Sequence, residues 1–250
     1  MTGTSGVKST FGLFVKYPEP GRVKTRLAGV IGDVLAAELY VAFMDDLIAR
    51  FRDINARRVL AYTPGHDRSR EYFERLADGR FELWLQPEGS LGERIESFFE
   101  AFGPEPVVLV GSDSPTLPRC DVEHALTALN NKVDCVLGPA TDGGVYLIGL
   151  HQRAFAPFGK HGLFDRIEWS TSRVFQQMLV AAQKAGASLD LLPLWYDIDT
   201  QPDTDFLRGH LAALRMTQPQ LWEEVAQTRR VLDVIAMARH YNPRPCNPKR

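Results

Sequence analysis

The run FGLFVKYPEPGRVKTRL, residues 11–27, decides the fold, because an apolar strand leads directly into a loop that cannot be helical. Pro18, Pro20 and Gly21 keep the backbone open after the strand. Four cations follow in quick succession on a chain whose formal net charge is only −2: Lys16, Arg22, Lys24 and Arg26. If residues 22–26 are extended, their three cations point to one side. This pattern favours either a polyphosphate site or a solvated basic loop.

The composition indicates a packed protein of moderate size. The chain has 250 residues, of which 44% are hydrophobic and 24% charged, enough for one large α/β domain or two small ones. The balance of 29 basic and 31 acidic residues argues against a nucleic-acid binder or a binder of anionic membranes. No apolar run is long enough to span a bilayer, and the polar N-terminus lacks the apolar core of a signal peptide. We therefore expect a cytoplasmic location.

Several common cofactor sites find no support in the sequence. Cys120, Cys135 and Cys246 match no zinc spacing and are expected to be ordinary thiols in a reducing compartment. The six histidines show no paired ligand spacing. The chain contains neither G-x-x-x-x-G-K-[ST] nor G-x-G-x-x-G, so P-loop and Rossmann dinucleotide sites lose their main support.

Strand-like and helix-like segments alternate along most of the chain. Strands are predicted over 11–16, 59–62, 81–85, 107–111, 135–138, 145–150 and 189–198. Helices are predicted over 34–51, 68–77, 91–102, 122–129, 172–184 and 203–214. The alternation predicts an α/β fold with a mainly parallel sheet, whose ligands bind beyond the carboxyl ends of the strands.

The predicted domain organisation is a single domain over residues 1–216 with a C-terminal extension over 217–250. The apolar spacing after residue 217 is compatible with one more amphipathic helix. The three prolines of residues 242–250 predict a loose tail. This extension could pack on the core or across a homodimer.

The first acidic turn is SDSP, residues 112–115, directly after the buried strand 107–111. A carboxylate at Asp113 could hold a hard divalent cation such as Mg²⁺. The alternative is an ordinary turn, because Asp, Ser and Pro commonly form turns by bonding the local backbone.

The second acidic turn is WYDIDTQPD, residues 195–203. Asp197 and Asp199 flank one residue, so in an extended chain both carboxylates face one way, which is unfavourable unless a cation or proton intervenes. Thr200 and Asp203 are predicted to start a helix by reciprocal capping. Capping leaves Asp197 and Asp199 unexplained.

Three further segments are ambiguous. PATDGGVYLIG, residues 139–149, is either a hairpin or a glycine-rich loop where Asp142 or Tyr146 bonds a substrate. QPEGSLGERI, residues 86–95, could offer backbone N–H groups to a base or ribose, or simply start a helix. HGLFDRIEWSTS, residues 161–172, supplies aromatic side chains that either line an acceptor pocket or pack in the core.

Taken in order, six segments resemble the DUF2064 family, whose members are described as GT-A-like glycosyltransferases. The segments are KYPEPGRVKTRL, GSLGERI, VLVGSDSPTLP, GPATDGGVYLIGL, LFDRIEWST and LWYDIDTQPD. The family is similar to molybdenum-cofactor guanylyltransferase and 2-phospho-L-lactate guanylyltransferase. The resemblance covers residues 11–214.

The resemblance implies a GT-A-like, nucleotide-diphospho-sugar transferase fold, a three-layer sandwich around a mainly parallel central sheet. It also implies roles for individual residues. The nucleotide-binding residues expected on this basis are Lys16, Arg22, Lys24, Thr25, Arg26, Gly89, Arg94, Ser112 and Asp113. The acceptor-binding residues expected are Asp142, Gly143, Gly144, Tyr146 and Trp169. Those expected to take part in catalysis are Lys24, Arg26, Asp113 and Asp142, and the metal ligands expected for Mg²⁺ or Mn²⁺ are Asp113, Asp199 and Asp197.

One departure concerns the loop after the first strand. Nucleotidyltransferases of this fold usually carry a glycine-rich loop with a G-x-R pattern there, whereas this chain has a proline-rich loop with K-T-R. The departure weakens the expectation that the donor is a nucleoside triphosphate.

The expected function is a metal-dependent transfer from a nucleotide donor, foremost glycosyl transfer from a nucleotide sugar to a small-molecule acceptor. One alternative is nucleotidyl transfer from a nucleoside triphosphate to a phosphorylated small molecule, with release of pyrophosphate. A second is a nucleotide-binding protein without turnover. None of these involves nucleic acid or a membrane.

Overall fold

The computed structural model describes residues 9–151, 164 and 166–241. Its contacts divide the chain into two compact units. The sheet unit comprises residues 1–17 and 47–197, and the helical unit comprises residues 18–46 and 198–250. This division differs from the boundary expected at residue 216, because α7 (Gln201–Thr217) is grouped with the C-terminal helices. Cys246 and the tail from residue 242 lie outside the described residues.

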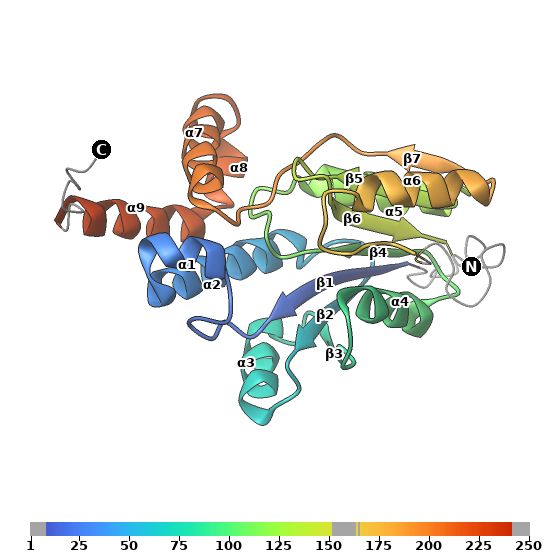
Figure 1. Ribbon diagram of the computed structural model, residues 1–250, viewed down its shortest axis with the longest axis horizontal. Coiled ribbons are helices and arrows are strands. Elements are labelled where there is room, and N and C mark those ends of the chain that lie inside the picture. Colours follow the sequence, from blue (N-terminus) through green and yellow to red (C-terminus); the bar gives the residue numbers. More distant parts are fainter. Residues whose placement is uncertain (1–8, 152–163, 165, 242–250) are drawn as a thin grey trace, which may run out of the picture. The chain divides into compact units, whose positions relative to one another are not determined.

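The sheet unit is built on a seven-stranded sheet in the order β3-β2-β1-β4-β6-β5-β7 (Figure 1). The strands are β1 (Thr10–Lys16), β2 (Arg57–Thr63), β3 (Glu82–Leu85), β4 (Val107–Val110), β5 (Cys135–Pro139), β6 (Val145–Leu150) and β7 (Leu189–Leu191). Strands β1 to β4 pair in parallel, as do β5 and β7, while β6 is antiparallel to both of its neighbours. The prediction of an α/β fold with a mainly parallel sheet is confirmed.

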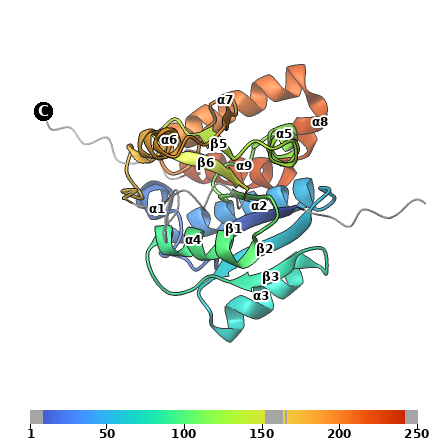
Figure 2. The same ribbon diagram turned by 90° about the vertical axis from the view of Figure 1, so that its right-hand side faces the viewer.

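Helices cover both faces of the sheet, and the strand alternation decides which residues meet them. On one face, strand residues such as Val59, Leu109 and Leu137 form a core with α4 (Leu91–Phe102) and α6 (Val174–Lys184). Figure 2 shows α4 against one side of β1 and β2. Gly12 of β1 leaves room for this close packing, since a Cβ there would lie 2.2 Å from the Phe98 ring.

The opposite face meets α3 (Asp67–Ala77), α5 (Arg119–Asn130) and the last turn of α2 (Asp33–Phe51). The Phe11 and Phe51 rings lie 4.9 Å apart, and those of Tyr62 and Phe73 lie 5.5 Å apart. Four consecutive buried residues make up β4, as expected for a strand covered on both faces.

The predicted strand over 189–198 is wrong in its extent, because β7 ends at Leu191. Pro193 follows and cannot donate a ladder hydrogen bond. Beyond it the chain rejoins the sheet edge through Trp195, which forms an isolated parallel bridge with Ala140. The Trp195 N–H donates to the Pro139 carbonyl at 3.0 Å. This bridge places the start of the second acidic turn beside the end of β5.

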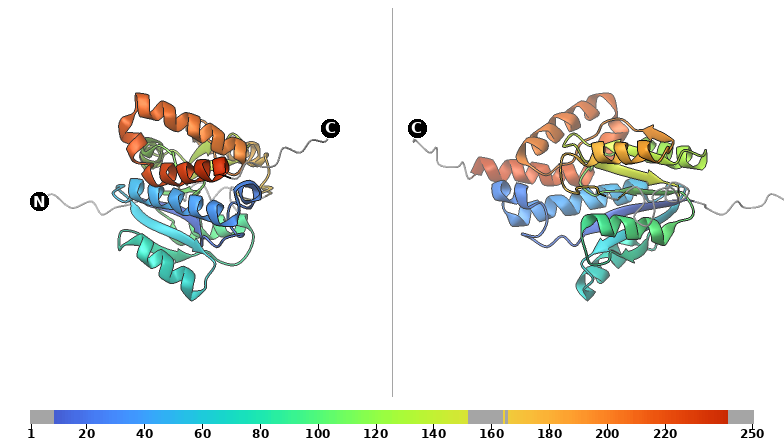
Figure 3. Two further views of the ribbon diagram at one scale, coloured as in Figure 1. Left: turned by 90° about the vertical axis from the view of Figure 1, so that its left-hand side faces the viewer. Right: turned by 45° about the vertical axis from the view of Figure 1, so that its right-hand side comes forward.

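The helical unit contains α1 (Thr25–Ile31), the first part of α2, α7, α8 (Pro219–Glu223) and α9 (Ala226–Tyr241). Figure 3 shows α7 in orange and α9 in red. The buried Asp46 carboxylate accepts hydrogen bonds from the N–H groups of Gln227 and Thr228, at 3.1 and 2.8 Å, and so caps the start of α9. Within the part of the chain that is described, no helix is long and apolar enough to cross a membrane.

Candidate functional site

The turn after β4 is held by hydrogen bonds from a buried cation, Arg50. The Arg50 guanidinium, on a side chain buried in the last turn of α2, donates to the carbonyls of Pro115 and Leu117 at 2.7 and 3.0 Å. Ser112 and Ser114 are buried, and Asp113 between them is half-buried. The predicted turn therefore exists, and its shape is set by a residue that the sequence reasoning missed.

The two acidic turns are joined inside the sheet unit. The Ser114 hydroxyl donates a short hydrogen bond to the Asp197 carboxylate. A second bond joins the same two segments, because the Thr116 hydroxyl donates to the Tyr196 hydroxyl at 3.0 Å. Burial raises the pKa of Tyr196 to about 12, so its hydroxyl stays neutral. The segment carrying Asp197 is thus bonded directly to the turn carrying Asp113.

The cationic loop does not have the extended conformation considered for residues 22–26. Lys24 adopts a left-handed conformation, with φ 47°, and α1 begins at the next residue, Thr25. Because a helix begins at Thr25, the three cations do not lie along one extended segment. Arg22 is exposed, the side chain of Arg26 is 76% exposed, and that of Lys24 is 2% exposed.

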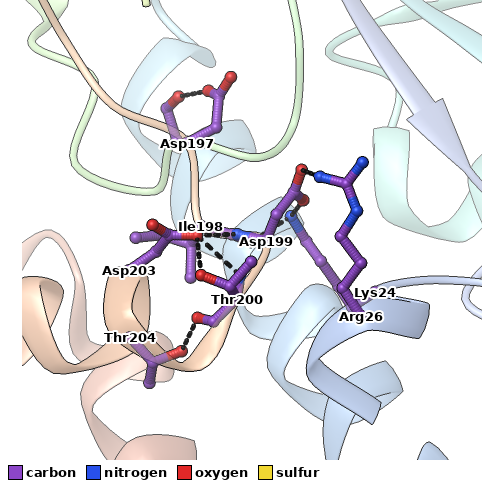
Figure 4. Close-up of polar contacts among 9 residues, drawn as sticks. Lys24, Arg26, Asp197, Ile198, Asp199, Thr200, Asp203 and Thr204 are labelled. Atoms are coloured by element: carbon purple, nitrogen blue, oxygen red, sulfur yellow. Dashed lines mark hydrogen bonds and ion pairs between the residues drawn. The ribbon is translucent and has the colours of Figure 1, made fainter. Parts of the chain in front are cut away.

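Within the helical unit, Lys24 reaches the turn at the start of α7 (Figure 4). Its Nζ lies 2.6 Å from the Ile198 carbonyl oxygen and 3.1 Å from the Asp199 Oδ1. Arg26 lies on the other carboxylate oxygen, with 3.9 Å between Nη1 and Oδ2. Asp199, predicted as a metal ligand, is held here by two cations.

The start of α7 is capped as the sequence predicts. The Asp203 carboxylate accepts hydrogen bonds from the N–H groups of Asp199 and Thr200, at 3.0 and 2.7 Å, and from the Thr200 hydroxyl at 2.7 Å (Figure 4). The two capping residues form a capping box. The backbone of this turn therefore has an anchor that is independent of Lys24.

The segment before α4 is a capped helix start. Ser90 and Glu93 form a capping box, and hydrogen bonds from the Ser90 backbone and hydroxyl lower the pKa of Glu93. The Arg94 guanidinium donates to the Gly89 carbonyl at 3.1 Å and to the Thr63 hydroxyl at 3.4 Å. Arg94 is thus held at the carboxyl end of β2, where a nucleotide contact remains a prediction.

The glycine-rich segment is a hairpin between the antiparallel strands β5 and β6. Asp142 is exposed, and its Oδ1 accepts from the Gly144 N–H at 2.8 Å. Gly143 has φ 87°, and a Cβ there would lie 2.1 Å from the Ser172 carbonyl oxygen. The loop is therefore tightly packed. The hydrogen bond within the turn uses only one of the two Asp142 carboxylate oxygens, Oδ1.

Two aromatic residues predicted to bind an acceptor make contacts within the protein. Tyr146 is buried, and its hydroxyl contacts the Pro193 carbonyl at 3.0 Å and the Asp121 carboxylate at 3.4 Å. Burial and the nearby Asp121 raise the pKa of Tyr146. Trp169 packs on the core, and its indole occupies the space that a Cβ on Gly92 would need. A role for Tyr146 and Trp169 in acceptor binding stays a prediction.

The remaining predicted residue, Lys16, ends β1 and is exposed. Among the residues that the structure describes, no three His, Cys, Asp or Glu side chains gather closely enough to hold a metal ion by themselves. The sheet unit instead brings two carboxylate turns together, those of Asp113 and Asp197.

Comparison with known proteins places the chain in a family. Residues 47–171 match the family model described as "Uncharacterized protein conserved in bacteria (DUF2064)". The chain belongs to the DUF2064 family. The matched segment includes the turn with Asp113 and the Asp142 hairpin, while the cationic loop and Asp199 lie outside it.

Solved structures extend the similarity over most of the chain. A candidate nucleotide-diphospho-sugar transferase from Desulfovibrio desulfuricans G20 is 32% identical, covers 92% of this chain and 98% of its own, and gives a TM-score of 0.77. This DUF2064 protein therefore has the nucleotide-diphospho-sugar transferase fold.

More distant structures show the same fold alone. A cytidylyltransferase from Leptospira borgpetersenii serovar Hardjo-bovis is 12% identical over 97% of this chain and all (100%) of its own, with a TM-score of 0.50. A 4-diphosphocytidyl-2C-methyl-D-erythritol synthase is 10% identical over 82% of this chain and 98% of its own, with a TM-score of 0.51. No curated protein matches the chain.

Proposed function

We propose that this DUF2064 protein is a transferase that moves a group from a nucleotide donor with the help of a divalent cation. The observation that carries the proposal is the hydrogen bond between Ser114 and Asp197, which joins the two acidic turns of the sheet unit. Two carboxylates beyond the carboxyl ends of strands, in a fold shared with a candidate nucleotide-diphospho-sugar transferase, suit a donor carrying phosphates.

The available ligands fit a cation that arrives with the donor. Mg²⁺ usually keeps several waters and takes one or two protein carboxylates together with substrate phosphates. That requirement is compatible with the lack of a ready-made cage among the described side chains. Asp113 and Asp197, both in the sheet unit, would hold the cation. When bound, Mg²⁺ or Mn²⁺ supplies Lewis-acid stabilisation of phosphate oxygens.

The cationic loop would supply the phosphate contacts. Arg22 and Arg26 are exposed, and guanidinium groups bind phosphate oxygens in a fixed fork geometry. Lys24 is the third cation proposed to neutralise charge on the leaving phosphate, once it separates from Asp199. Catalysis of this kind rests on positioning and electrostatics and needs no covalent intermediate.

The finer proposal is glycosyl transfer. The sugar–phosphate bond of a nucleotide sugar breaks, the acceptor oxygen bonds the sugar carbon, and a nucleoside diphosphate leaves with the bonding electron pair. The exposed Asp142 carboxylate, on the hairpin predicted to face the acceptor, is proposed to take the acceptor proton. Support comes from the similarity to the candidate nucleotide-diphospho-sugar transferase from Desulfovibrio desulfuricans G20.

Nucleotidyl transfer is the second candidate, and the density of cations near the end of β1 favours it. In that reaction an acceptor phosphate oxygen attacks the α-phosphorus of a nucleoside triphosphate, and pyrophosphate leaves. Four cations suit three phosphates better than two. The product that is released, nucleoside diphosphate or pyrophosphate, separates the two candidates.

A thermal-shift panel tests the proposal. The purified protein is heated with nucleoside triphosphates or nucleotide sugars, each with Mg²⁺, Mn²⁺ or EDTA. A ligand at a hundredfold excess over its Kd stabilises the native state by about 2.7 kcal/mol. A metal-dependent shift with a nucleotide sugar supports glycosyl transfer, and one with a triphosphate supports nucleotidyl transfer. A panel with no metal-dependent shift contradicts the proposal.

A further inference from the structure

The helices α7, α8 and α9 of the helical unit (Figure 1) line a pocket of about 610 Å³. Pockets that bind small molecules usually have volumes of about 300–1,000 Å³. None of the lining residues is among those that the proposed function assigns to the donor, the acceptor or the cation. The proposed reaction therefore gives this pocket no role.

Regular helical spacing brings the lining residues together. Residues of α7 at intervals of three and four positions fall on one face of that helix, and α9 repeats this spacing over one turn. The residues of α7 are Arg208, Leu211, Ala212, Arg215 and Met216, and those of α9 are Arg229, Leu232 and Asp233. Such faces usually pack against a neighbouring element. Here part of the apolar surface stays uncovered, since Met216 is 85% exposed.

The apolar part of the lining suits a ligand with an apolar body. Leu211 and Leu232 are buried, Trp222 of α8 is half-buried, and Ala212 is exposed. A molecule that covers these side chains gains the free energy of removing apolar surface from water. The pocket therefore favours a molecule with an aliphatic or aromatic part.

The charged part of the lining is dominated by guanidinium groups. Those of Arg229 and Arg215 lie 3.2 and 5.5 Å from the centroid of the Trp222 ring. The two groups are thus no further apart than the sum of these distances, which is within the Debye length of about 10 Å at 0.1 M salt. Arg208 adds a third guanidinium, which donates to the Leu232 carbonyl, a bond that uses only one of its N–H donors.

The carboxylates beside the pocket do not balance these cations. Glu223 pairs with Arg229, with 3.3 Å between Oε2 and Nη2, and Asp233 is part of the lining. Among the residues that the structure describes, neither Arg208 nor Arg215 is paired with a carboxylate. Three guanidinium groups facing two carboxylates leave one positive charge in excess. The pocket is therefore complementary to a ligand with a single negative charge.

We propose that this pocket is a binding site for a small molecule with an apolar or aromatic body and one anionic group, such as a carboxylate. The body lies against Leu211, Leu232 and Trp222, and the anionic group binds the guanidinium groups of Arg215 and Arg208. This inference does not rest on the proposed function, because the two sets of residues do not overlap.

Two fluorescent probes with the same aromatic body test the site. Anilinonaphthalene sulfonate carries one sulfonate, phenylnaphthylamine carries none, and the emission of both rises in apolar surroundings. Arg215→Met removes the charge but keeps an unbranched side chain that suits a helix. Ala212→Phe fills the pocket from the exposed side of α7. The control is Arg70→Met, which removes an exposed cation on α3 that pairs with Glu74. Circular dichroism checks that each variant is folded.

The expected result separates charge from apolar contact. Arg215→Met should bind the sulfonate probe roughly tenfold or more weakly than the wild type, because a hydrogen bond to a charged group is lost. It should bind the uncharged probe as the wild type does. Ala212→Phe should lose both probes, and Arg70→Met should bind both as the wild type does.

Three outcomes would overturn the proposal. If Arg215→Met binds the sulfonate probe as tightly as the wild type, or loses both probes alike, the guanidinium does not bind the anionic group. If folded Ala212→Phe binds both probes like the wild type, the probes bind elsewhere. If the wild type binds neither probe, the pocket is not a site for this class of ligand.

Discussion

At the scale of single residues, Arg50 determines the form of the turn that carries Asp113. Its guanidinium donates to two carbonyl oxygens of the turn from a position that is 5% exposed. A turn sequence such as SDSP can adopt several local conformations. The buried donor selects one of them, and so positions the Asp113 carboxylate through the backbone of the turn.

Replacing Arg50 with methionine should destabilise the protein by about 3 kcal/mol, because two buried carbonyl groups lose their donor. Urea denaturation followed by circular dichroism measures the change. Arg52→Met is the matched control, since Arg52 forms an exposed pair with Asp53 and should change stability by less than about 0.5 kcal/mol. Equal losses in the two variants would show that Arg50 does not hold the turn.

Asp121 gives a prediction for pH dependence. Burial raises its pKa, while bonds from Cys120 and Tyr146 partly oppose the shift. A carboxyl group whose folded pKa is raised favours folding in its protonated form. That contribution is full below the ordinary value of 3.8 and is lost as pH rises through the raised value.

Asp121→Asn should therefore become more stable relative to the wild type as pH rises from below 3.8 to neutrality. The relative gain should be about 1.4 kcal/mol for each unit by which the Asp121 pKa is raised. Urea denaturation of both proteins across this range measures it. A stability difference that stays constant with pH would contradict the assigned pKa direction.

At the scale of elements, the β5–β6 hairpin depends on the absence of a side chain at Gly143. The residue has φ 87°, and its α-carbon faces the Ser172 carbonyl. Gly79 offers a comparison, because it has φ 64° but nothing lies within 4 Å of the position that a Cβ would take. The two positions share the backbone strain of a positive φ and differ in steric crowding.

Gly79→Ala should cost about 1 kcal/mol from the positive φ alone. Gly143→Ala should cost at least about 2 kcal/mol more, because a Cβ 2.1 Å from backbone oxygen forces the chain to move. Thermal unfolding of both variants measures the difference. Similar losses would mean that the 143–172 contact is not part of the native packing.

The sequence predicts the strands and most helices of this chain because apolar periodicity reports local structure. Residues 107–110 form a strand with four consecutive buried side chains, as their composition indicates. The short helix α1 is missed because it follows Lys24, a residue with no capping side chain and a left-handed backbone. The end of β7 is missed because an extended chain continues past Pro193 without pairing as a strand.

The candidate site is predictable only in part, for a physical reason. The order of motifs along the chain places polar residues after strands, and that is enough to single out Asp113, Asp197 and Asp199. Contacts between distant residues, such as Arg50 with Pro115 or Tyr146 with Pro193, leave no local pattern. The same holds for Lys24, whose charge predicts a phosphate ligand while its packing pairs it with Asp199.

At the scale of the whole molecule, the family match covers residues of only one of the two units. The DUF2064 match spans residues 47–171, inside the sheet unit. The helical unit supplies Lys24, Arg26 and Asp199, and the structure from Desulfovibrio desulfuricans G20 covers 92% of the chain. The proposed transferase depends above all on Asp113, in the sheet unit.

The sharpest test compares donor binding by the wild type and by Asp113→Asn, using calorimetry with the panel nucleotide that shifts the wild type. We predict that Mg²⁺ strengthens binding at least about tenfold in the wild type and little in Asp113→Asn, because a carboxylate ligand is lost. Asp53→Asn, which alters an exposed carboxylate, should match the wild type. Equal metal dependence in Asp113→Asn and the wild type would contradict the assignment of Asp113 as a metal ligand, and the proposed transferase with it.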